Sequence, residues 1–480
     1  MRYETVIGIE THVELSTASK MFCGCPAGFG GDPNTSVCPV CLGLPGALPV
    51  PNERAIQWTV ALGIALGCEI TQHSVFHRKN YFYADLPKNY QISQFDLPLC
   101  VGGHLEIDPG SGARRIGITR VHLEEDTGKS THLGGGGRIH DAEGALIDFN
   151  RSGIPLMEVV SEPDIRTPEE ARAYAQELRA IVLALGISDA RLEEGSFRFD
   201  ANVSLRPEGD EALGVKVEVK NMNSMRSLQR ALAFEIDRQT ALLDDGELIA
   251  QETRHWDEEA GRTQPGRSKE ESSDYRYFAE PDLVPLQTNP EVVERIRAGL
   301  PELPALRRAR YVTMGIEPTA AATLVAGDLA NLFDATVAAG GDPRAAANWL
   351  TGEVAAHLNR TGAAPADILL DGASLAELIG MVGGGDLSAT AAKEVLIGVL
   401  AGEGSPRKIA TTRDLLQVSD ESALGPEVDS VLAAHPDEVG RIRGGEERLV
   451  GFLVGQVMKA TGGKADPRLV DRLIRERVGL

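Results

Sequence analysis

The segment at residues 9–15 alternates between ionisable and largely apolar side chains, and this alternation constrains the fold more than any other feature. Successive side chains of a β-strand point to opposite faces, so Glu10, His12 and Glu14 share one face of the predicted strand. Carboxylates combined with an imidazole suit Mg²⁺ or Mn²⁺ and the phosphates that these ions carry. The segment therefore predicts a strand, running from Val6 to Leu15, with a metal-binding face. Such a face is expected of a site that handles ATP without a Ser or Cys nucleophile.

Similar patterns predict further strands at residues 115–123, 154–160, 197–205 and 215–219. The polar positions of these strands and of the acidic run that follows the first of them are Glu124, Glu125, Arg198, Asp200, Asn202, Ser204, Lys216, Glu218 and Lys220. Any one such face is typical of the solvated side of an antiparallel sheet. Several faces that combine carboxylates, histidine and lysine favour a site for a cation and phosphate.

Glu158 interrupts an otherwise apolar face of the strand at 154–160. A carboxylate in that position is costly to bury unless it is paired or bound to a metal. An edge position or a salt bridge is the alternative explanation for Glu158. We interpret it as a metal ligand.

Two lysines and the absence of a nucleophile motif agree with a site for a cation and phosphate. Lys79 and Lys88 flank a tyrosine-rich segment at 80–87, and lysines beside a magnesium site offset phosphate charge. The chain contains no Gly-x-Ser-x-Gly nucleophile elbow, so any ammonia that it uses must come from another polypeptide. The glycine run at 134–137 is expected to form a turn.

The most specific pattern for metal binding consists of four cysteines. Cys23 and Cys25 are followed, after twelve residues, by Cys38 and Cys41. Two close pairs of cysteines with a loop between them predict a tetrahedral Zn²⁺ knuckle. Four protein ligands leave no open position on the ion, so this zinc is expected to be structural.

The strands are separated by turns and loops, which predicts an α+β fold with a largely antiparallel sheet. One helix is expected to begin at Pro168, with Thr167 as N-cap and Glu170 completing a capping box. It carries apolar residues at helical spacing over 171–185 and ends at Gly186. A second helix is expected at 227–243.

Five prolines between residues 281 and 304 mark a boundary, after which the chain becomes Ala- and Leu-rich with helical periodicity. We therefore divide the chain into a sheet domain at 1–292 and helical domains at 293–408 and 409–480. The segment at 441–480 holds nine Lys/Arg against five Asp/Glu, an excess of four in a chain of net charge −22.

Composition limits the possible partners. The overall negative charge is unusual for a nucleic-acid-binding protein, and the aromatic content of 5% does not favour base-stacking platforms. Any RNA partner needs a local basic surface. We find neither a signal-peptide pattern nor an apolar run of membrane-spanning length, so a cytoplasmic protein without membrane contact is expected.

Long strings of residues resemble the B subunit of the aspartyl/glutamyl-tRNA amidotransferases. They lie at 4–15, 78–83, 90–96, 122–130, 161–166, 198–207, 274–278 and 455–460, and the likeness extends over essentially all 480 residues. The resemblance implies a first domain similar to the catalytic sheet of glutamine synthetase, called a cradle, followed by two α-helical domains. It also implies ATP-dependent conversion of Glu-tRNA(Gln), and in many relatives Asp-tRNA(Asn), to the amidated forms.

In this family the amidase (A) subunit supplies ammonia and the small (C) subunit braces the complex, so both are implied partners beside misacylated tRNA. Carried over, the metal and phosphate positions fall on Glu10, His12, Glu125, Glu158 and Asp200. Glu10, His12, Glu125 and Asp200 are also the implied catalytic residues, and Lys79, Lys88 and Glu124 are implied ATP neighbours. The resemblance makes the tail the implied tRNA-binding part, with Lys459, Lys464 and Arg468 as its contacts.

Two alternatives remain open at the level of sequence. A zinc knuckle combined with a basic tail would also suit a non-catalytic tRNA-binding scaffold. A free-standing ligase acting on a small carboxylate is a weaker alternative, because the large helical extension argues against it.

Overall fold

The computed structural model describes residues 2–28, 30–133, 144–266, 275–417 and 421–480. The chain forms two compact units, Met1–Pro304 and Ala305–Leu480. The first is a mixed α+β unit and the second is helical, which confirms the predicted succession of a sheet region and a helical region. The turn expected at 134–137 lies outside the described residues.

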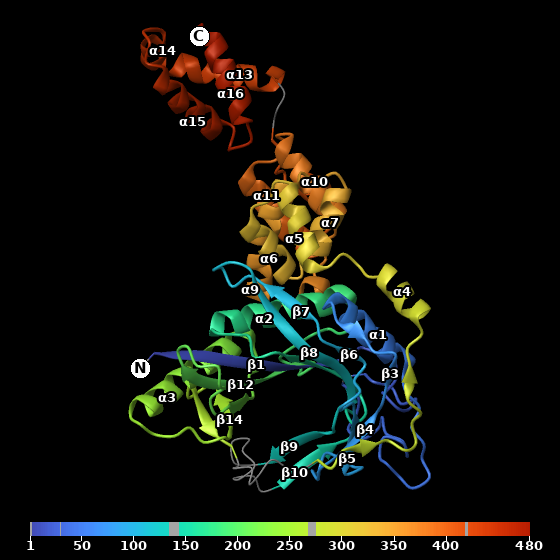
Figure 1. Ribbon diagram of the computed structural model, residues 1–480. Coiled ribbons are helices and arrows are strands. Elements are labelled where there is room, and N and C mark those ends of the chain that lie inside the picture. The colour runs from blue at the N-terminus through green and yellow to red at the C-terminus, as the bar shows by residue number, and fades with distance from the viewer. Residues whose placement is uncertain (1, 29, 134–143, 267–274, 418–420) are drawn as a thin grey trace. The chain divides into compact units, whose positions relative to one another are not determined.

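A ten-stranded sheet dominates the first unit, in the order β15-β14-β13-β12-β1-β11-β8-β6-β2 with β7 also paired to β8 (Figure 1). Its strands are β1 (Tyr3–Glu14), β2 (Glu69–Ile70), β6 (Cys100–Val101), β7 (His104–Ile107), β8 (Arg114–Glu125), β11 (Pro155–Ser161), β12 (Phe197–Pro207), β13 (Val217–Lys220), β14 (Thr253–Asp257) and β15 (Arg262–Pro265). Among the described pairings of this sheet, only β13 and β14 run parallel. The largely antiparallel sheet expected from the sequence is therefore present.

One face of this sheet is covered by three helices: α1 (Glu53–Ala65), α2 (Pro168–Leu185) and α3 (Met225–Asp244). Figure 1 shows α1 and α2 over β1 and β8. The apolar positions of the alternating strands meet the helices there, and buried side chains such as Ile7, Val13, Val159, Tyr174 and Leu178 join one core. The opposite set of strand positions is consequently left for polar groups.

Helix α2 begins as the sequence predicts but with a different capping partner. The Thr167 hydroxyl accepts a hydrogen bond from Glu170 N at 3.1 Å, and Gly186 ends the helix in the left-handed region at φ 66°. The Glu170 carboxylate accepts from Arg166 N at 2.8 Å, one residue before the N-cap. Helix α3 begins two residues earlier than expected, because the Ser224 hydroxyl caps Ser227 N.

Smaller sheets complete the first unit. They comprise β16-β4-β5, β9-β10 and β3-β17, with β3 (His73–Ser74), β4 (His77–Asn80), β5 (Tyr90–Ser93), β9 (Lys129–Leu133), β10 (Gly144–Asp148), β16 (Phe278–Ala279) and β17 (Leu286–Gln287). Figure 1 shows β4, β5, β9 and β10 on the side of the large sheet away from α1 and α2. They therefore border its polar face.

The first unit extends past residue 292. Helix α4 (Pro290–Ala298) packs Val293 and Ile296 against the core of the sheet domain, so the unit ends at Pro304. The proline-rich segment is thus partly a packed edge of the first unit.

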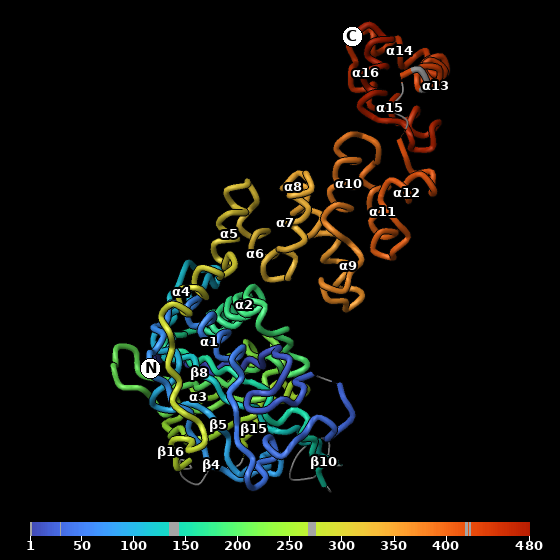
Figure 2. Tube along the Cα trace, turned by 90° about the vertical axis from the view of Figure 1, so that its right-hand side faces the viewer, coloured from blue at the N-terminus to red at the C-terminus, as the bar shows by residue number. Residues whose placement is uncertain are grey.

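The second unit is a series of helices (Figure 2). They are α5 (Pro304–Thr313), α6 (Pro318–Ala326), α7 (Ala330–Ala338), α8 (Pro343–Trp349), the π-helical turn η3 (Leu350–Val354), α9 (Ala355–Thr361), the 3₁₀ turn η4 (Pro365–Asp367), α10 (Gly372–Gly383), α11 (Ala389–Leu400), α12 (Pro406–Thr412), α13 (Glu421–Ala434), α14 (Pro436–Arg443), the 3₁₀ turn η5 (Glu447–Leu449), α15 (Val450–Ala460) and α16 (Pro467–Val478). Helices α13 to α16 bury a hydrophobic cluster that includes Val428, Leu453 and Leu473. The division of this unit at residue 408 stays a prediction.

Across the described residues, every helix is too short or too polar to cross a lipid bilayer.

Candidate metal and phosphate site

The polar face of the large sheet is built by the register of four adjacent strands. His12 on β1 lies opposite Glu158 on β11, and Glu158 lies opposite His122 on β8. On the other side of β1, Glu10 lies opposite Asp200 on β12. Alternation within each strand and register between strands together collect these side chains on one surface.

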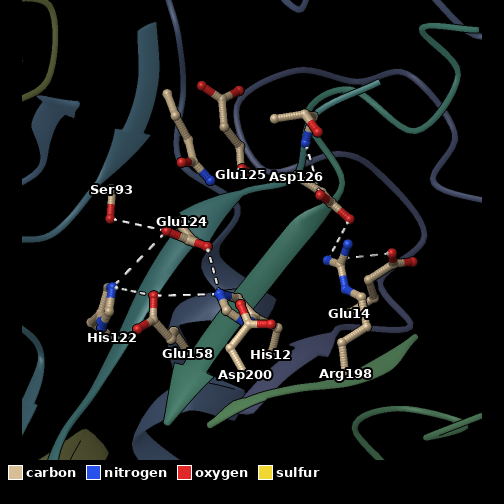
Figure 3. A network of polar contacts seen from close by, with 12 residues as sticks. His12, Glu14, Ser93, His122, Glu124, Glu125, Asp126, Glu158, Arg198 and Asp200 are labelled. Atoms are coloured by element: carbon tan, nitrogen blue, oxygen red, sulfur yellow. Dashed lines mark hydrogen bonds and ion pairs between the residues drawn. The ribbon is translucent and has the colours of Figure 1, made fainter. Parts of the chain in front are cut away.

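His12, Glu124 and Glu158 form the first cluster, which we call the histidine–carboxylate group (Figure 3). His12 Nε2 lies 3.6 Å from Glu158 Oε2 and 3.8 Å from Glu124 Oε1. One ligand atom from each residue falls within 4.8 Å of the others. Oxygen and imidazole ligands at this spacing suit a hard or borderline divalent cation.

His122 and Ser93 lie beside this group. His122 Nε2 is 3.4 Å from Glu158 Oε2 and 4.0 Å from Glu124 Oε2, and the Ser93 hydroxyl donates to Glu124 Oε2 at 3.2 Å. His122 and Glu124 are both 2% exposed, so the carboxylates depend on these neighbours for compensation.

Burial and neighbouring charges shift the pKa values of these side chains in different directions. Burial opposes protonation of His12, but the hydrogen bond and charge of Glu158, followed by the charge of Glu124, raise the His12 pKa to about 9. Burial, with the Glu158 charge next, raises the pKa of Glu124 to about 6. Burial also lowers the pKa of His122 to about 4. The metal-free group therefore holds a proton on His12 that a cation would displace.

Glu10, Asp200 and Glu218 form a second cluster, the carboxylate group, with ligand atoms again within 4.8 Å. Lys220 Nζ bridges Asp200 Oδ2 at 2.5 Å and Glu218 Oε1 at 3.0 Å. Burial, followed by the charges of Glu158 and Asp200, raises the pKa of Glu10. A neighbouring lysine balances part of the negative charge of this group.

Glu125 does not join either group. The alternation of β8 turns its side chain to the side opposite Glu124, and Figure 3 shows it pointing away from His12 and Glu158. Its carboxylate pairs with Lys88 and accepts from Ile92 N at 3.0 Å. The family resemblance implied Glu125 as a metal position beside Glu124, but only one of two neighbouring strand residues can face a given side.

Asp126, the next acid, is held by arginine. Arg198 Nη2 donates to Asp126 Oδ2 at 2.8 Å and lies 3.9 Å from Glu14 Oε1. Burial raises the pKa of Asp126, but the charges of Arg198 and Arg151 outweigh burial and hold it well below its ordinary value. Burial and the nearby Asp126 charge raise the pKa of Glu14 to about 8. This corner of the face is internally paired.

Lys79 on β4 reaches the histidine–carboxylate group from the neighbouring sheet. Its Nζ lies 5.0 Å from the ring centroid of Tyr275 and 5.9 Å from that of Tyr81. Burial opposes its charge, but Glu124 and other neighbours raise the Lys79 pKa above its ordinary value. Lys79 therefore stays protonated beside the buried acids.

The four cysteines Cys23, Cys25, Cys38 and Cys41 place their sulfurs within 4.8 Å of one another, as a metal knuckle requires. A tetrahedron with metal–sulfur bonds of about 2.3 Å has sulfur–sulfur edges of about 3.8 Å, and the Cys38 and Cys41 sulfurs are 3.9 Å apart. Cys38 N also donates to the Cys41 sulfur at 3.1 Å. The set is compatible with Zn²⁺.

Many basic side chains of the tail, residues 409–480, form ion pairs with acidic side chains of the same segment. Lys464 forms an ion pair with Asp414, and Arg477 Nε lies 2.8 Å from Asp429 Oδ1. Lys459 lies in the last turn of α15 and Arg468 in the first turn of α16. Internal pairing thus reduces the positive surface that the local excess of charge suggested.

Sequence reasoning named Glu218 and Lys220 only among the polar positions of their strand, and it gave His122 no role at these sites. Their positions in the alternating strands were visible, but a single face of one strand does not show which neighbours it meets.

Comparisons with known proteins agree with this architecture. Residues 5–294 match the GatB/GatE catalytic domain family, and residues 331–478 match the GatB domain family. The relative from Frankia casuarinae is 54% identical over 100% of this chain and 96% of its own length. Those from Moorella thermoacetica (51% identical, 100% of both chains) and Brevibacillus brevis (48% identical, 99% of this chain and 98% of the relative) are similar over equally complete spans.

All three relatives carry the name of the B subunit of an aspartyl/glutamyl-tRNA(Asn/Gln) amidotransferase. Because the identity is high and both proteins are covered almost completely in each comparison, the chain belongs to the B-subunit family of the aspartyl/glutamyl-tRNA amidotransferases.

Proposed function

We propose that this chain is the subunit that converts Glu-tRNA(Gln), Asp-tRNA(Asn) or both to the amidated forms with ATP and ammonia. The side-chain carboxylate of the esterified amino acid attacks the γ-phosphorus of ATP and ADP leaves. Ammonia then attacks the carbon of the acyl phosphate, phosphate leaves and the nitrogen loses a proton. The single observation that carries this proposal is the convergence of acids and His12 from four strands on one face.

In this proposal the histidine–carboxylate group and the carboxylate group are the places for Mg²⁺ or Mn²⁺, with Glu10, His12, Glu158 and Asp200 as ligands. A divalent ion held by these residues would offset phosphate charge and align the transferring group. Glu124 lies among these ligands, and Lys79 supplies a positive charge beside them. Glu125 acts through its pair with Lys88 at the border of the site and does not bind the same ion.

The remaining assignments are proposals that rest on the sequence patterns and on the family resemblance. We infer a structural Zn²⁺ in the four-cysteine knuckle, a cytoplasmic setting, and the amidase (A) subunit with the small (C) subunit as partners. The sheet domain is proposed to be the glutamine synthetase-like cradle. Lys459, Lys464 and Arg468 are the proposed tRNA contacts of the tail, with Lys464 having to leave Asp414 to act.

The decisive experiment combines the chain with its amidase and small subunits, ATP and misacylated tRNA. Formation of amidated tRNA and tRNA-dependent ADP release are measured, with glutamine and with ammonium chloride as nitrogen source. We expect His12→Ala and Glu158→Gln to lower both rates by about 100-fold or more. Glu106→Gln, which removes an exposed carboxylate on β7 of the same sheet, serves as the matched control.

Wild-type rates in His12→Ala and Glu158→Gln would contradict the proposed site. Retention of tRNA binding without any ADP release in the wild-type complex would instead favour the non-catalytic scaffold.

A further inference from the structure

Lys20 is a buried cation outside the groups described above. Only 1% of its surface is exposed, and it follows β1 directly before the cysteine knuckle. Its ammonium donates to Ser36 O at 2.8 Å and to Phe149 O at 3.3 Å, and it lies 3.8 Å from the Cys41 sulfur. The two carbonyl partners carry no net charge, although burying a full positive charge is costly without a compensating one.

The cysteine knuckle supplies that compensation when it is loaded. A divalent ion bound by four thiolates has a net charge of about −2, because cysteine binds metal as the thiolate. The Lys20 ammonium lies against one of these sulfurs and would offset part of that charge. Residues that hydrogen-bond to metal ligands commonly set metal affinity.

Lys20 and its neighbour Met21 also attach the knuckle to the acidic end of β8. Met21 N donates to Gly153 O at 2.7 Å, Gly153 N donates to Asp126 O at 2.9 Å, and Asp126 N donates to Ile154 O at 2.8 Å. The first two bonds join the knuckle segment to the strand end, and the third is a second bond between Asp126 and the segment that contains Gly153.

Gly153 lies between Lys20, Cys41 and Glu125. A Cβ at this position would lie 3.4 Å from Lys20 Cδ, 3.5 Å from Cys41 Cβ and 3.8 Å from Glu125 Oε2. A cavity of about 190 Å³ is lined by residues of the knuckle region and of the strand end, among them Lys20, Cys23, Cys41, Lys88, Glu125 and Gly153.

We propose that Lys20 is a positioning residue that balances the charge of the metal-loaded knuckle and, through Phe149 and the Met21–Gly153 bond, fixes the strand end that carries Glu124, Glu125 and Asp126. The effect on metal retention stands independently, whereas the effect on catalysis rests on the proposed function. Zinc at the knuckle thereby influences the shape of the acidic face without taking part in the reaction.

The first test uses the full chain in complex with its partner subunits and measures zinc release to a chromogenic chelator. We expect Lys20→Met and Lys20→Gln to release zinc at least about 10-fold faster than wild type, in line with other residues that contact metal ligands. Lys20→Arg, which keeps the charge, should restore most of the retention, and Lys408→Met, at an exposed lysine of α12, should match wild type. Wild-type release rates in both neutral variants would overturn the role in metal retention.

The second test needs no variant. Hydrogen exchange of the wild-type complex is compared with zinc bound and after zinc removal, at the amides of Asp126 and Gly153. We expect exchange at both amides to accelerate when zinc is removed, while the amide of Glu170 in the first turn of α2 keeps its rate. Unchanged exchange at Asp126 and Gly153 would overturn the positioning role.

The link to catalysis is tested by adding zinc. Under the proposal, saturating Zn²⁺ restores amidation by Lys20→Met, which a merely structural role for Lys20 would not allow. Lack of rescue, with zinc measured as bound, overturns this link. An inactive wild-type complex would overturn the proposed function alone, because zinc release and hydrogen exchange do not depend on activity.

Discussion

At the scale of single residues, the polar face places chemically similar groups in different environments. These environments give the groups different pKa values. Glu124 and Glu158 are both buried carboxylates of the same cluster. Burial dominates for Glu124 and raises its pKa to about 6, whereas for Glu158 the charges of His122 and His12 outweigh burial and lower its pKa. Two carboxylates with different proton affinities beside a protonated histidine are suited to exchanging a proton for a cation.

The raised pKa of His12 predicts how stability depends on pH. A group whose pKa rises from 6.5 to about 9 on folding stabilises the folded state fully below pH 6.5, and this stabilisation is lost as the pH rises through 9. For magnesium-free protein we expect the first unit to lose up to about 3 kcal/mol between about pH 6.5 and 9.5. Urea unfolding at several pH values measures the loss.

His12→Gln is the control for this prediction, because it removes the titrating group while keeping a polar side chain. Its stability should change less steeply with pH over the same interval. Parallel pH profiles for the two proteins would contradict the assignment of the raised pKa to His12.

At the scale of elements, the strands determine which side chains meet and the helices determine how the sheet is backed. Helix α1 approaches the sheet closely because Gly63 has no side chain where Cys100 of β6 and Ile70 of β2 come against it. A Cβ at Gly63 would lie 2.5 Å from Cys100 Sγ and 3.1 Å from Ile70 Cδ1. The helix and strand would have to separate to admit it.

We therefore expect Gly63→Ala to destabilise the first unit by about 1–3 kcal/mol through overpacking. Thermal unfolding followed by circular dichroism measures the change. Gly380→Ala is the matched control, since it lies within helix α10 with open space around its Cβ position. There the higher helix propensity of alanine should leave stability unchanged or raise it slightly. Equal effects of both substitutions would argue against close approach of α1.

The cap of helix α2 allows a second prediction at this scale. Thr167→Ala removes the acceptor of the Glu170 amide and should cost about 1 kcal/mol of stability. Thr167→Ser, which keeps the hydroxyl, should remain close to wild type in the same urea unfolding measurement. A cost as large for Thr167→Ser as for Thr167→Ala would show that the methyl group, and not the hydrogen bond, is responsible.

At the scale of the whole molecule, a chain of net charge −22 must bind a polyanion through local positive groups. In the tail, Arg475 is 2.9 Å from Asp471 Oδ2 and 3.2 Å from Glu447 Oε2, so its charge is already offset. Lys459 and Arg468 near the ends of α15 and α16 are the proposed contacts.

We expect the double variant Lys459→Ala/Arg468→Ala to weaken tRNA binding and to reduce the slope of log Kd against log salt concentration by about 2. Filter binding at several salt concentrations measures both quantities. Arg475→Ala should change them much less, because this arginine is paired within the tail. A wild-type salt slope in the double variant would place the tRNA contacts elsewhere.

The order of residues along the chain is enough to specify five strands of the large sheet (β1, β8, β11, β12 and β13), the capped start of α2 and the spacing of the cysteine knuckle. These features follow from local rules, namely alternation along a strand, the geometry of a helix N-terminus and the reach of a short loop. The family resemblance can likewise be recognised from the sequence alone.

Which polar faces meet depends instead on the packing of distant segments. The order of strands and their register brought Glu218 and Lys220 to Asp200 and brought His122 to Glu158, and it turned Glu125 toward Lys88. It also buried Lys20 against the knuckle. These contacts join residues far apart in sequence, so they depend on strand pairing, which the pattern of a single segment does not specify.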